Sequence, residues 1–187
     1  MNHWLLVDTS CKKGIIAITN IKKIINQIYL KKGKRYDKFI ADGILMILRK
    51  SNISIDKING IAIGVGPGSL IGIRTTISIT KGICASLNIP LIGVNTLLSI
   101  SIDKKIASKK FIVFYRLGSE KIIGRFGKNI FFISKNLISK IINFCDDVIL
   151  CNFLYDFKSK NIIKKDGPNG YGILMALKRQ FILGGRK

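Results

Sequence analysis

Short runs of apolar residues, separated by glycine, asparagine and charged segments, divide the first half of the chain. Three of these runs, Trp4–Val7, Gly14–Thr19 and Ile24–Leu30, have the length and the β-branched composition of strands. Helical spacing of apolar positions follows over Tyr36–Lys50, and another strand-like run follows over Ile58–Gly64. An antiparallel meander that continues into alternating helices and strands predicts a mixed sheet covered by helices.

The first half ends in a helix, a strand and a helix, and the pattern then starts again after Ser108. The remaining elements are predicted at Leu70–Leu87, Pro90–Val94, Thr96–Ala107, Phe111–Tyr115, Lys121–Phe126, Asn129–Ile133, Ser134–Phe144 and Val148–Cys151. A polar segment with a turn cluster then precedes a final helix at about residues 171–183. We therefore expect an α/β protein with an N-terminal lobe at residues 1–107 and a smaller lobe at residues 108–187.

A glycine-rich turn joins the strand that ends at Gly64 to the helix that begins at Leu70. Gly66, Pro67 and Gly68 favour a tight strand-to-helix connection, and Ser69 stands at the N-cap position. The start of such a helix can bind a phosphate or a carboxylate. The turn can equally serve only to set the angle of the helix. No lysine and no second phosphate loop accompanies it, which favours the structural interpretation.

A second candidate for phosphate chemistry lies at the end of the first strand. Asp8 is followed by two hydroxyl residues, and a carboxylate at that position can take part in a Mg²⁺–phosphate contact. The alternative is a simple turn that these polar side chains cap. Together, the residues assigned to a vestigial phosphate loop are Asp8, Thr9, Ser10, Gly64, Gly66, Pro67, Gly68, Ser69 and Gly72.

Few side chains are available for catalysis. His3 is the only histidine and Glu120 the only glutamate, and no Ser/His, Cys/His, metalloprotease or Walker motif is present. The four cysteines lack CxxC spacing and are expected to be reduced thiols. No secretory signal opens the chain, so a cytoplasmic location, or the equivalent interior of a symbiont or organelle, is expected. We predict no catalytic residue and no metal site, and hence a protein that is not itself an enzyme.

The charge is strongly positive, with 32 Lys and Arg against 10 Asp and Glu, a formal net charge of +22. Such a balance attracts nucleic acids without sequence specificity. Lysine, isoleucine and asparagine are also the residues that an A/T-biased genome over-uses. The charge therefore has two explanations, a contact with RNA or the codon bias of a symbiont or organelle.

Two of the predicted helices, Tyr36–Lys50 and Leu70–Leu87, carry apolar residues on two faces. A helix that lies on a sheet needs one apolar stripe, so a second stripe indicates a second partner. Small residues on the later helix also allow another helix to approach closely. The residues assigned to this partner interface are Phe39, Ile40, Gly43, Met46, Ile47, Ile73, Arg74, Ile77, Ser78, Thr80, Lys81, Gly82 and Cys84.

Several stretches, in the same order along the chain, resemble the TsaB family, also called YeaZ. They are Leu5–Ser10, the sequence GVGPGS with the G-x-R at Gly72–Arg74, Lys81-Gly82, and Ile89–Val94. The resemblance covers roughly the first hundred residues, and GxGPGSxxGxR after a strand is a specific combination. It implies an actin-like, RNase H-like fold of two lobes, from the sugar kinase/Hsp70 superfamily. The second lobe departs from the family pattern, so we expect it to be reduced.

The resemblance also implies a function. It implies a non-catalytic subunit needed for threonylcarbamoylation of N6 of adenosine 37 in tRNA, which binds the catalytic paralogue TsaD through its first two helices. TsaD carries the metal, the ATPase TsaE joins the complex, tRNA is contacted indirectly, and the isolated chain needs no cofactor. The sequence leaves open whether the isolated chain is a monomer or forms a homodimer through the same helices, which an exposed apolar patch would favour. A residual actin-like ATPase and a basic RNA-binding protein remain the alternatives.

Overall fold

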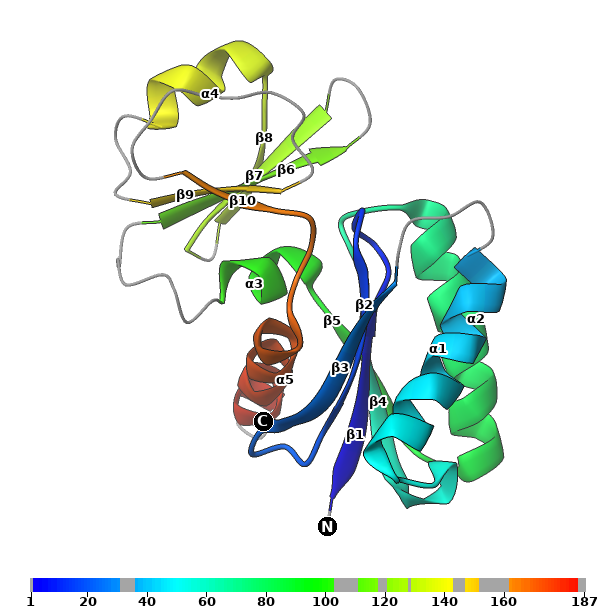
Figure 1. Cartoon of the computed structure of the whole chain (residues 1–187). Helices are drawn as coiled ribbons and strands as arrows, with labels where there is room; N and C mark the ends of the chain where they lie inside the picture. Colours follow the sequence, from blue (N-terminus) through cyan, green and yellow to red (C-terminus); the bar gives the residue numbers. More distant parts are fainter. Residues whose placement is uncertain are drawn as a thin grey trace.

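The computed structural model describes residues 2–30, 36–102, 111–117, 121–127, 129–142, 147–151 and 162–184. These residues form two lobes, each built on a five-stranded sheet (Figure 1). In the described part of the chain, no helix is both long enough and apolar enough to cross a membrane.

The first sheet has the strand order β3-β2-β1-β4-β5. Its central strand β1 pairs antiparallel with β2 and parallel with β4, and β4 pairs parallel with β5. The strands are β1 (His3–Asp8), β2 (Gly14–Thr19), β3 (Ile24–Leu30), β4 (Ile58–Gly64) and β5 (Leu91–Val94). The order and the directions confirm a meander that continues into parallel crossovers.

Helices cover both faces of the first sheet (Figure 1). Leu5 and Val7 point from β1 to the face that α1 and α2 cover, whereas Trp4 and Leu6 point to the face that α5 covers. This alternation follows from the two-residue period of a strand. The helices are α1 (Tyr36–Ser51), α2 (Leu70–Leu87), α3 (Thr96–Ser101) and α5 (Gly170–Gly184), and a short 3₁₀ turn, Ile55–Lys57, precedes β4.

The second sheet has the order β10-β9-β6-β7-β8. Its elements are β6 (Phe111–Leu117), β7 (Lys121–Phe126), β8 (Asn129–Ile133), α4 (Lys135–Ile142), β9 (Asp147–Cys151) and β10 (Ile162–Lys165). Helix α4 packs on one face, and α3 contributes to the core on the other. Counted from β8, the order and directions of this sheet repeat those of the first sheet. The duplicated arrangement confirms the actin-like α/β fold that the sequence predicts, but the sheet of the second lobe has as many strands as that of the first and is not reduced.

Three predictions of secondary structure or domain membership need correction. The sequence predicts a polar loop where the structure has strand β10. This strand has only four residues and ends in two lysines, so its apolar pattern is too short to be recognised. Helix α3 ends at Ser101, before the predicted end at Ala107, which lies outside the described residues. The last helix was assigned to the second lobe, but it packs on the first sheet through its apolar face.

Candidate functional site

The turn after β1 and the glycine-rich turn before α2 are bonded directly to each other. The Ser69 amide donates to the Ser10 carbonyl over 2.7 Å. The Thr9 hydroxyl donates to the Gly72 carbonyl over 2.8 Å and lies 2.6 Å from the Thr76 hydroxyl. Ser69 is also the N-cap of α2, since its side chain accepts from the Gly72 amide, as the sequence predicts. The peptide bond between Gly66 and Pro67 is cis.

Three glycines allow this close contact. A Cβ on Gly64 would lie 2.0 Å from the Asp8 carboxylate, one on Gly68 would lie 2.3 Å from the Ser10 carbonyl, and one on Gly72 would lie 2.3 Å from the Thr9 carbonyl. The two turns therefore pack backbone against backbone. This direct contact favours a packing role for the turns.

The Asp8 carboxylate is fully buried and already hydrogen-bonded. Its Oδ1 accepts from the Ser10 amide and hydroxyl over 2.9 and 2.6 Å, and its Oδ2 accepts from the Thr96 hydroxyl over 2.8 Å. Burial raises the pKa of Asp8, although its hydrogen bonds with Ser10 and Thr96 act in the opposite direction. Among the described residues, no three His, Cys, Asp or Glu side chains form a group that could hold a metal ion.

We expect Asp8→Asn to gain stability relative to the original protein as the pH rises above the ordinary Asp value of 3.8. The pKa of Asp8 is raised in the folded state, so its contribution is fully present below 3.8 and is lost as the pH rises through the folded-state pKa. Asparagine has no such dependence. Urea unfolding of both proteins at a series of pH values measures the free energy of unfolding of Asp8→Asn minus that of the original protein. If this value stays constant or falls as the pH rises, the assignment is wrong.

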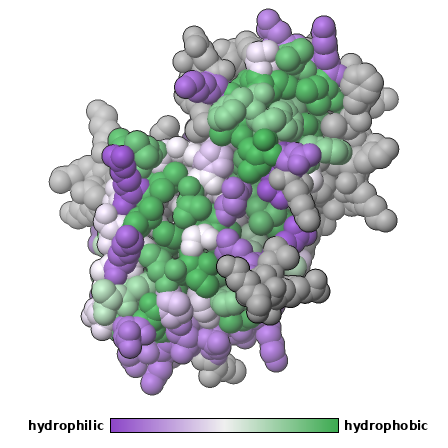
Figure 2. Space-filling view, turned by 180° about the vertical axis from the view of Figure 1, so that it is seen from behind, coloured by the Kyte–Doolittle hydropathy of each residue, from purple (hydrophilic) through white to green (hydrophobic). Residues whose placement is uncertain are grey.

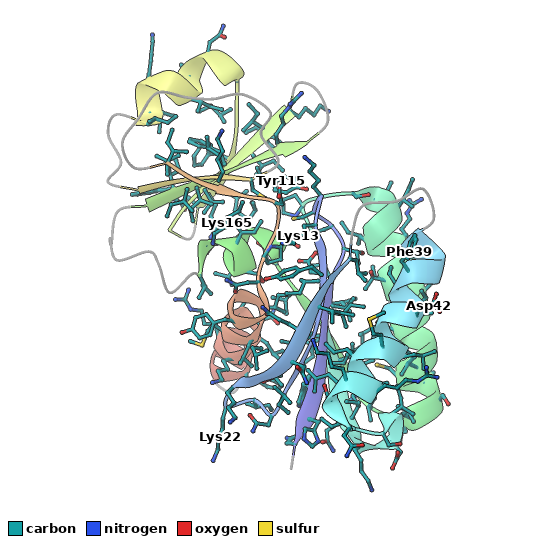
Figure 3. All side chains as sticks on the ribbon, in the orientation of Figure 1. Lys13, Lys22, Phe39, Asp42, Tyr115 and Lys165 are labelled. Carbon is teal, nitrogen blue, oxygen red and sulfur yellow. The ribbon has the colours of Figure 1, made fainter. Side chains whose placement is uncertain are left out.

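The same region joins the two lobes. The buried Tyr115 hydroxyl donates to the Ser10 carbonyl over 3.1 Å, and the Lys165 ammonium donates to the Ile100 carbonyl over 3.1 Å. Figure 3 shows Tyr115 and Lys13 at the junction of the lobes. The Cys11 thiol is buried there, and both its hydrogen bond with Cys151 and its burial raise its pKa. The two lobes therefore contact each other through these hydrogen bonds and a buried cluster that includes Cys11, Leu97 and Tyr115.

The second candidate surface is the outer side of α1 and α2, which lie side by side on the first sheet (Figure 1). On α1, Phe39 is 48% exposed and Met46 57% exposed. Figure 3 shows Phe39 and Asp42 on the side of α1 that faces away from the sheet. On α2 the exposed predicted residues are Arg74, Ser78, Lys81 and Gly82, while Ile73 and Ile77 are half-buried. We refer to these eight predicted residues, Phe39 and Met46 with the six from α2, as the helix surface.

Five residues predicted for the partner interface face the core instead. They are Ile40, Gly43, Ile47, Thr80 and Cys84, all buried under the helices. The many isoleucines make both faces of α2 appear apolar in the sequence. In the structure, the face that packs on the sheet carries small residues, such as Thr76, Thr80 and Cys84. Thr80 tolerates burial because its hydroxyl donates to the Thr76 carbonyl over 2.6 Å.

Exposed apolar residues that the sequence did not assign extend the candidate surface. Leu45 on α1 is 52% exposed, and Leu70 and Ile71 in the first turn of α2 are 59% and 73% exposed. Figure 2 shows hydrophobic residues on the rear of both lobes, including the region of the first lobe where α2 begins. An isoleucine in a helix gives no sign of its exposure in the sequence, so only the orientation of α2 reveals this extension.

Comparison with known proteins finds similarity to the TsaD and TsaB proteins. The sequence profile of the TsaD family, described as tRNA N6-adenosine threonylcarbamoyltransferase, matches residues 24–114. The TsaB protein of Escherichia coli (strain K12), described as a tRNA threonylcarbamoyladenosine biosynthesis protein, is 31% identical over 97 residues, which cover 52% of this chain and 42% of that protein. The TsaB protein of Buchnera aphidicola subsp. Schizaphis graminum is 32% identical over 93 residues, which cover 50% of this chain and 44% of that protein. Over about half of its length, the chain is similar to TsaB proteins.

The sequence match and the structural match cover different extents of the TsaB (YeaZ) fold. YeaZ from Pseudomonas aeruginosa has a TM-score of 0.79 at 13% identity, over 99% of this chain and 94% of that chain. At this identity the likeness concerns the fold. In sequence, the chain spans less than half the length of the two TsaB relatives. The two-lobed fold therefore extends beyond the part in which sequence similarity to TsaB is detected.

Proposed function

We propose that this chain is a non-catalytic subunit in the biosynthesis of threonylcarbamoyladenosine at position 37 of tRNA, and that it binds a TsaD-type catalytic subunit through the helix surface. The observation that carries the proposal is the exposure of large apolar side chains on α1 beside small residues on α2. Phe39 and Met46 are about half exposed, and a Cβ on Gly82 would meet no atom within 4 Å. Bulky side chains next to a low, open helix face suit the packing of partner helices.

The vestigial phosphate loop supports the non-catalytic part of the proposal. Its turns pack directly on each other, and both Asp8 carboxylate oxygens accept hydrogen bonds from the chain itself. Nucleotide and metal are therefore assigned to the partner subunits, TsaD and a TsaE-type ATPase, with tRNA contacted through the complex. The proposed place of action is the cytoplasm or the equivalent interior of a symbiont or organelle.

The helix surface can be tested by co-expressing the chain with TsaD from the same organism. Met46→Asp and Gly82→Asp each place a carboxylate at an exposed position, and a Cβ at Gly82 meets no atom within 4 Å. Each is expected to weaken the complex by about 100-fold, because a carboxylate that partner helices cover loses its water. Co-purification and calorimetric titration measure the effect.

A matched control exists on the other lobe. Leu137 on α4 is 48% exposed, similar to Met46, and Leu137→Asp makes the same chemical change away from the helix surface. It is expected to leave the affinity for TsaD unchanged. If Met46→Asp and Gly82→Asp bind TsaD as tightly as Leu137→Asp does, the helix surface is not the interface. The same three variants, followed by sedimentation of the isolated chain, report whether a homodimer uses the helix surface.

The alternative of a residual ATPase predicts that the isolated chain binds nucleotide. Calorimetry with ATP and Mg²⁺ distinguishes it directly, because binding that Asp8→Ala abolishes would overturn the non-catalytic assignment. The alternative of an RNA-binding protein predicts affinity for tRNA in the absence of TsaD, and the formal net charge of +22 makes a salt titration the necessary control.

A further inference from the structure

Three of the four edge strands of the two sheets carry protection against pairing with another chain. On β3, the Asn26 side chain donates to Ser51 at the end of α1, and Gln27 accepts from the Gly170 amide of α5. On β5, the Gly93 carbonyl accepts from the Gln180 side chain over 2.9 Å. Strand β10 ends in two lysines. Charged residues and covering side chains are common ways to prevent edge pairing.

Strand β8 lacks these features. It pairs with β7 on one side, and no other described strand pairs with it. Its sequence, Asn129–Ile133, contains no charged residue and no proline. Phe132 is 76% exposed and Ile130 49% exposed, and both point to the same side of the sheet because they are two residues apart. Such an edge is open both to backbone pairing and to apolar contact.

A hollow lies at the end of β8. Its volume is about 540 Å³, and it is lined by Lys121, Ile122, Phe132, Ile133 and Ser134. The lining is mostly apolar, with one ammonium group among the lining side chains. If the strand of another protein paired with β8, a side chain near this end of β8 would contact an apolar surface. The Lys121 ammonium group would lie beside it.

The sequence that contains and flanks β8 carries charge of one sign. The sequence from Lys121 to Ile142 contains five basic residues and no acidic residue. The basic residues are Lys121, Arg125, Lys128, Lys135 and Lys140. A second copy of the chain would bring the same positive charge to this edge, so self-pairing is disfavoured. A negatively charged occupant is favoured.

We propose that β8 binds an extended, acidic segment of a partner protein by strand addition. The backbone of the segment continues the ladder of the second sheet, its alternate apolar side chains contact Ile130 and Phe132, and its carboxylates lie near the basic residues of β7 and α4. Main-chain bonds then give affinity, and alternate side chains give specificity. A nucleic acid is also negatively charged, but it has no peptide backbone that could pair with the N–H and C=O groups of β8. The site lies on the second lobe and does not depend on the helix surface.

The test uses the isotope-labelled full chain and a short synthetic peptide of alternating valine and glutamate, followed by amide NMR. The peptide is expected to shift the amide signals of β8, Lys121 and Ser134. Phe132→Lys is expected to weaken this binding by about tenfold or more, because it removes the main apolar contact. Leu137→Lys adds the same charge on α4, where it favours an acidic peptide, and is expected not to weaken the binding.

Four results would overturn the proposal. They are an absence of shifts at β8, equal shifts with a valine–lysine peptide, equal affinity of the Phe132→Lys protein, and shifts at β8 that a single-stranded RNA produces but the peptide does not. Raising the protein concentration without peptide is the remaining control, since shifts at β8 under that condition would assign the edge to a second copy of the chain. Circular dichroism checks that Phe132→Lys is folded, which its exposed position favours.

Discussion

Replacing Gly72 by alanine is expected to lower the free energy of unfolding by about 2–3 kcal/mol, the upper range for overpacking a tight contact. The new methyl group would lie 2.3 Å from the Thr9 carbonyl oxygen and 3.2 Å from the Thr9 hydroxyl. Thr9 has little freedom to move away, because its hydroxyl is bonded to the Gly72 carbonyl and contacts Thr76. Helix α2 must therefore separate from the first turn of the chain or shift along the sheet.

Urea unfolding followed by the fluorescence of Trp4, the only tryptophan, measures the loss. Gly82→Ala is the matched control, because it is the same substitution in the same helix but its methyl group meets no atom within 4 Å. The control is expected to gain up to about 1 kcal/mol from helix propensity. Equal effects of the two substitutions would show that the contact between α2 and Thr9 does not limit stability.

Replacing Phe114 by alanine is expected to cost about 3–5 kcal/mol and to act mainly on the second lobe. Phe114 is fully buried in the cluster between the second sheet and α4, together with Ile138 and Ile142. The core between the first sheet and α1 contains none of these residues. We therefore expect the second sheet to lose protection against hydrogen exchange while β1 and β4 keep most of theirs.

Hydrogen exchange measured by mass spectrometry on the whole chain distinguishes the two lobes. Ile112→Val, in the same cluster, is the graded control and is expected to cost about 0.5–1.5 kcal/mol. An equal loss of protection in both sheets would show that the lobes unfold as one unit. In that case, the contact between α3 and the second sheet, where Leu97 and Ile100 are buried, would be the main link between the stabilities of the two lobes.

The strands and the long helices could be predicted because residues close to their ends in sequence determine where they begin and end. Strand β2 begins at Gly14 and is followed by a turn that the Asn20 side chain stabilises by accepting from two backbone amides. Helix α2 begins after the Ser69 cap and ends at Asn88, which adopts the left-handed conformation. Caps and turns of this kind depend on a few neighbouring residues, so one sequence is enough to find them.

The face that a helix buries was harder to predict. On α2, Thr76 and Cys84 pack inward while Ile71 is 73% exposed. The inward face is selected by close backbone approach at Gly72 and by hydrogen bonds to Thr9, which are contacts between segments far apart in sequence. Hydrophobicity alone ranks these residues in the wrong order. For the same reason, the interface prediction combined outward residues of the helix surface with residues of the core.

The position of α5 determines when the first lobe can be completed during synthesis. Trp4, Leu6 and Ile15 are made early, yet the residues that cover them, such as Ile173 and Leu177, belong to the last described helix. The residues up to and including α5 must therefore leave the ribosome before that face of the first sheet is shielded. A nascent chain arrested before α5 presents an uncovered apolar sheet, which is the kind of surface that chaperones bind and that leads to aggregation.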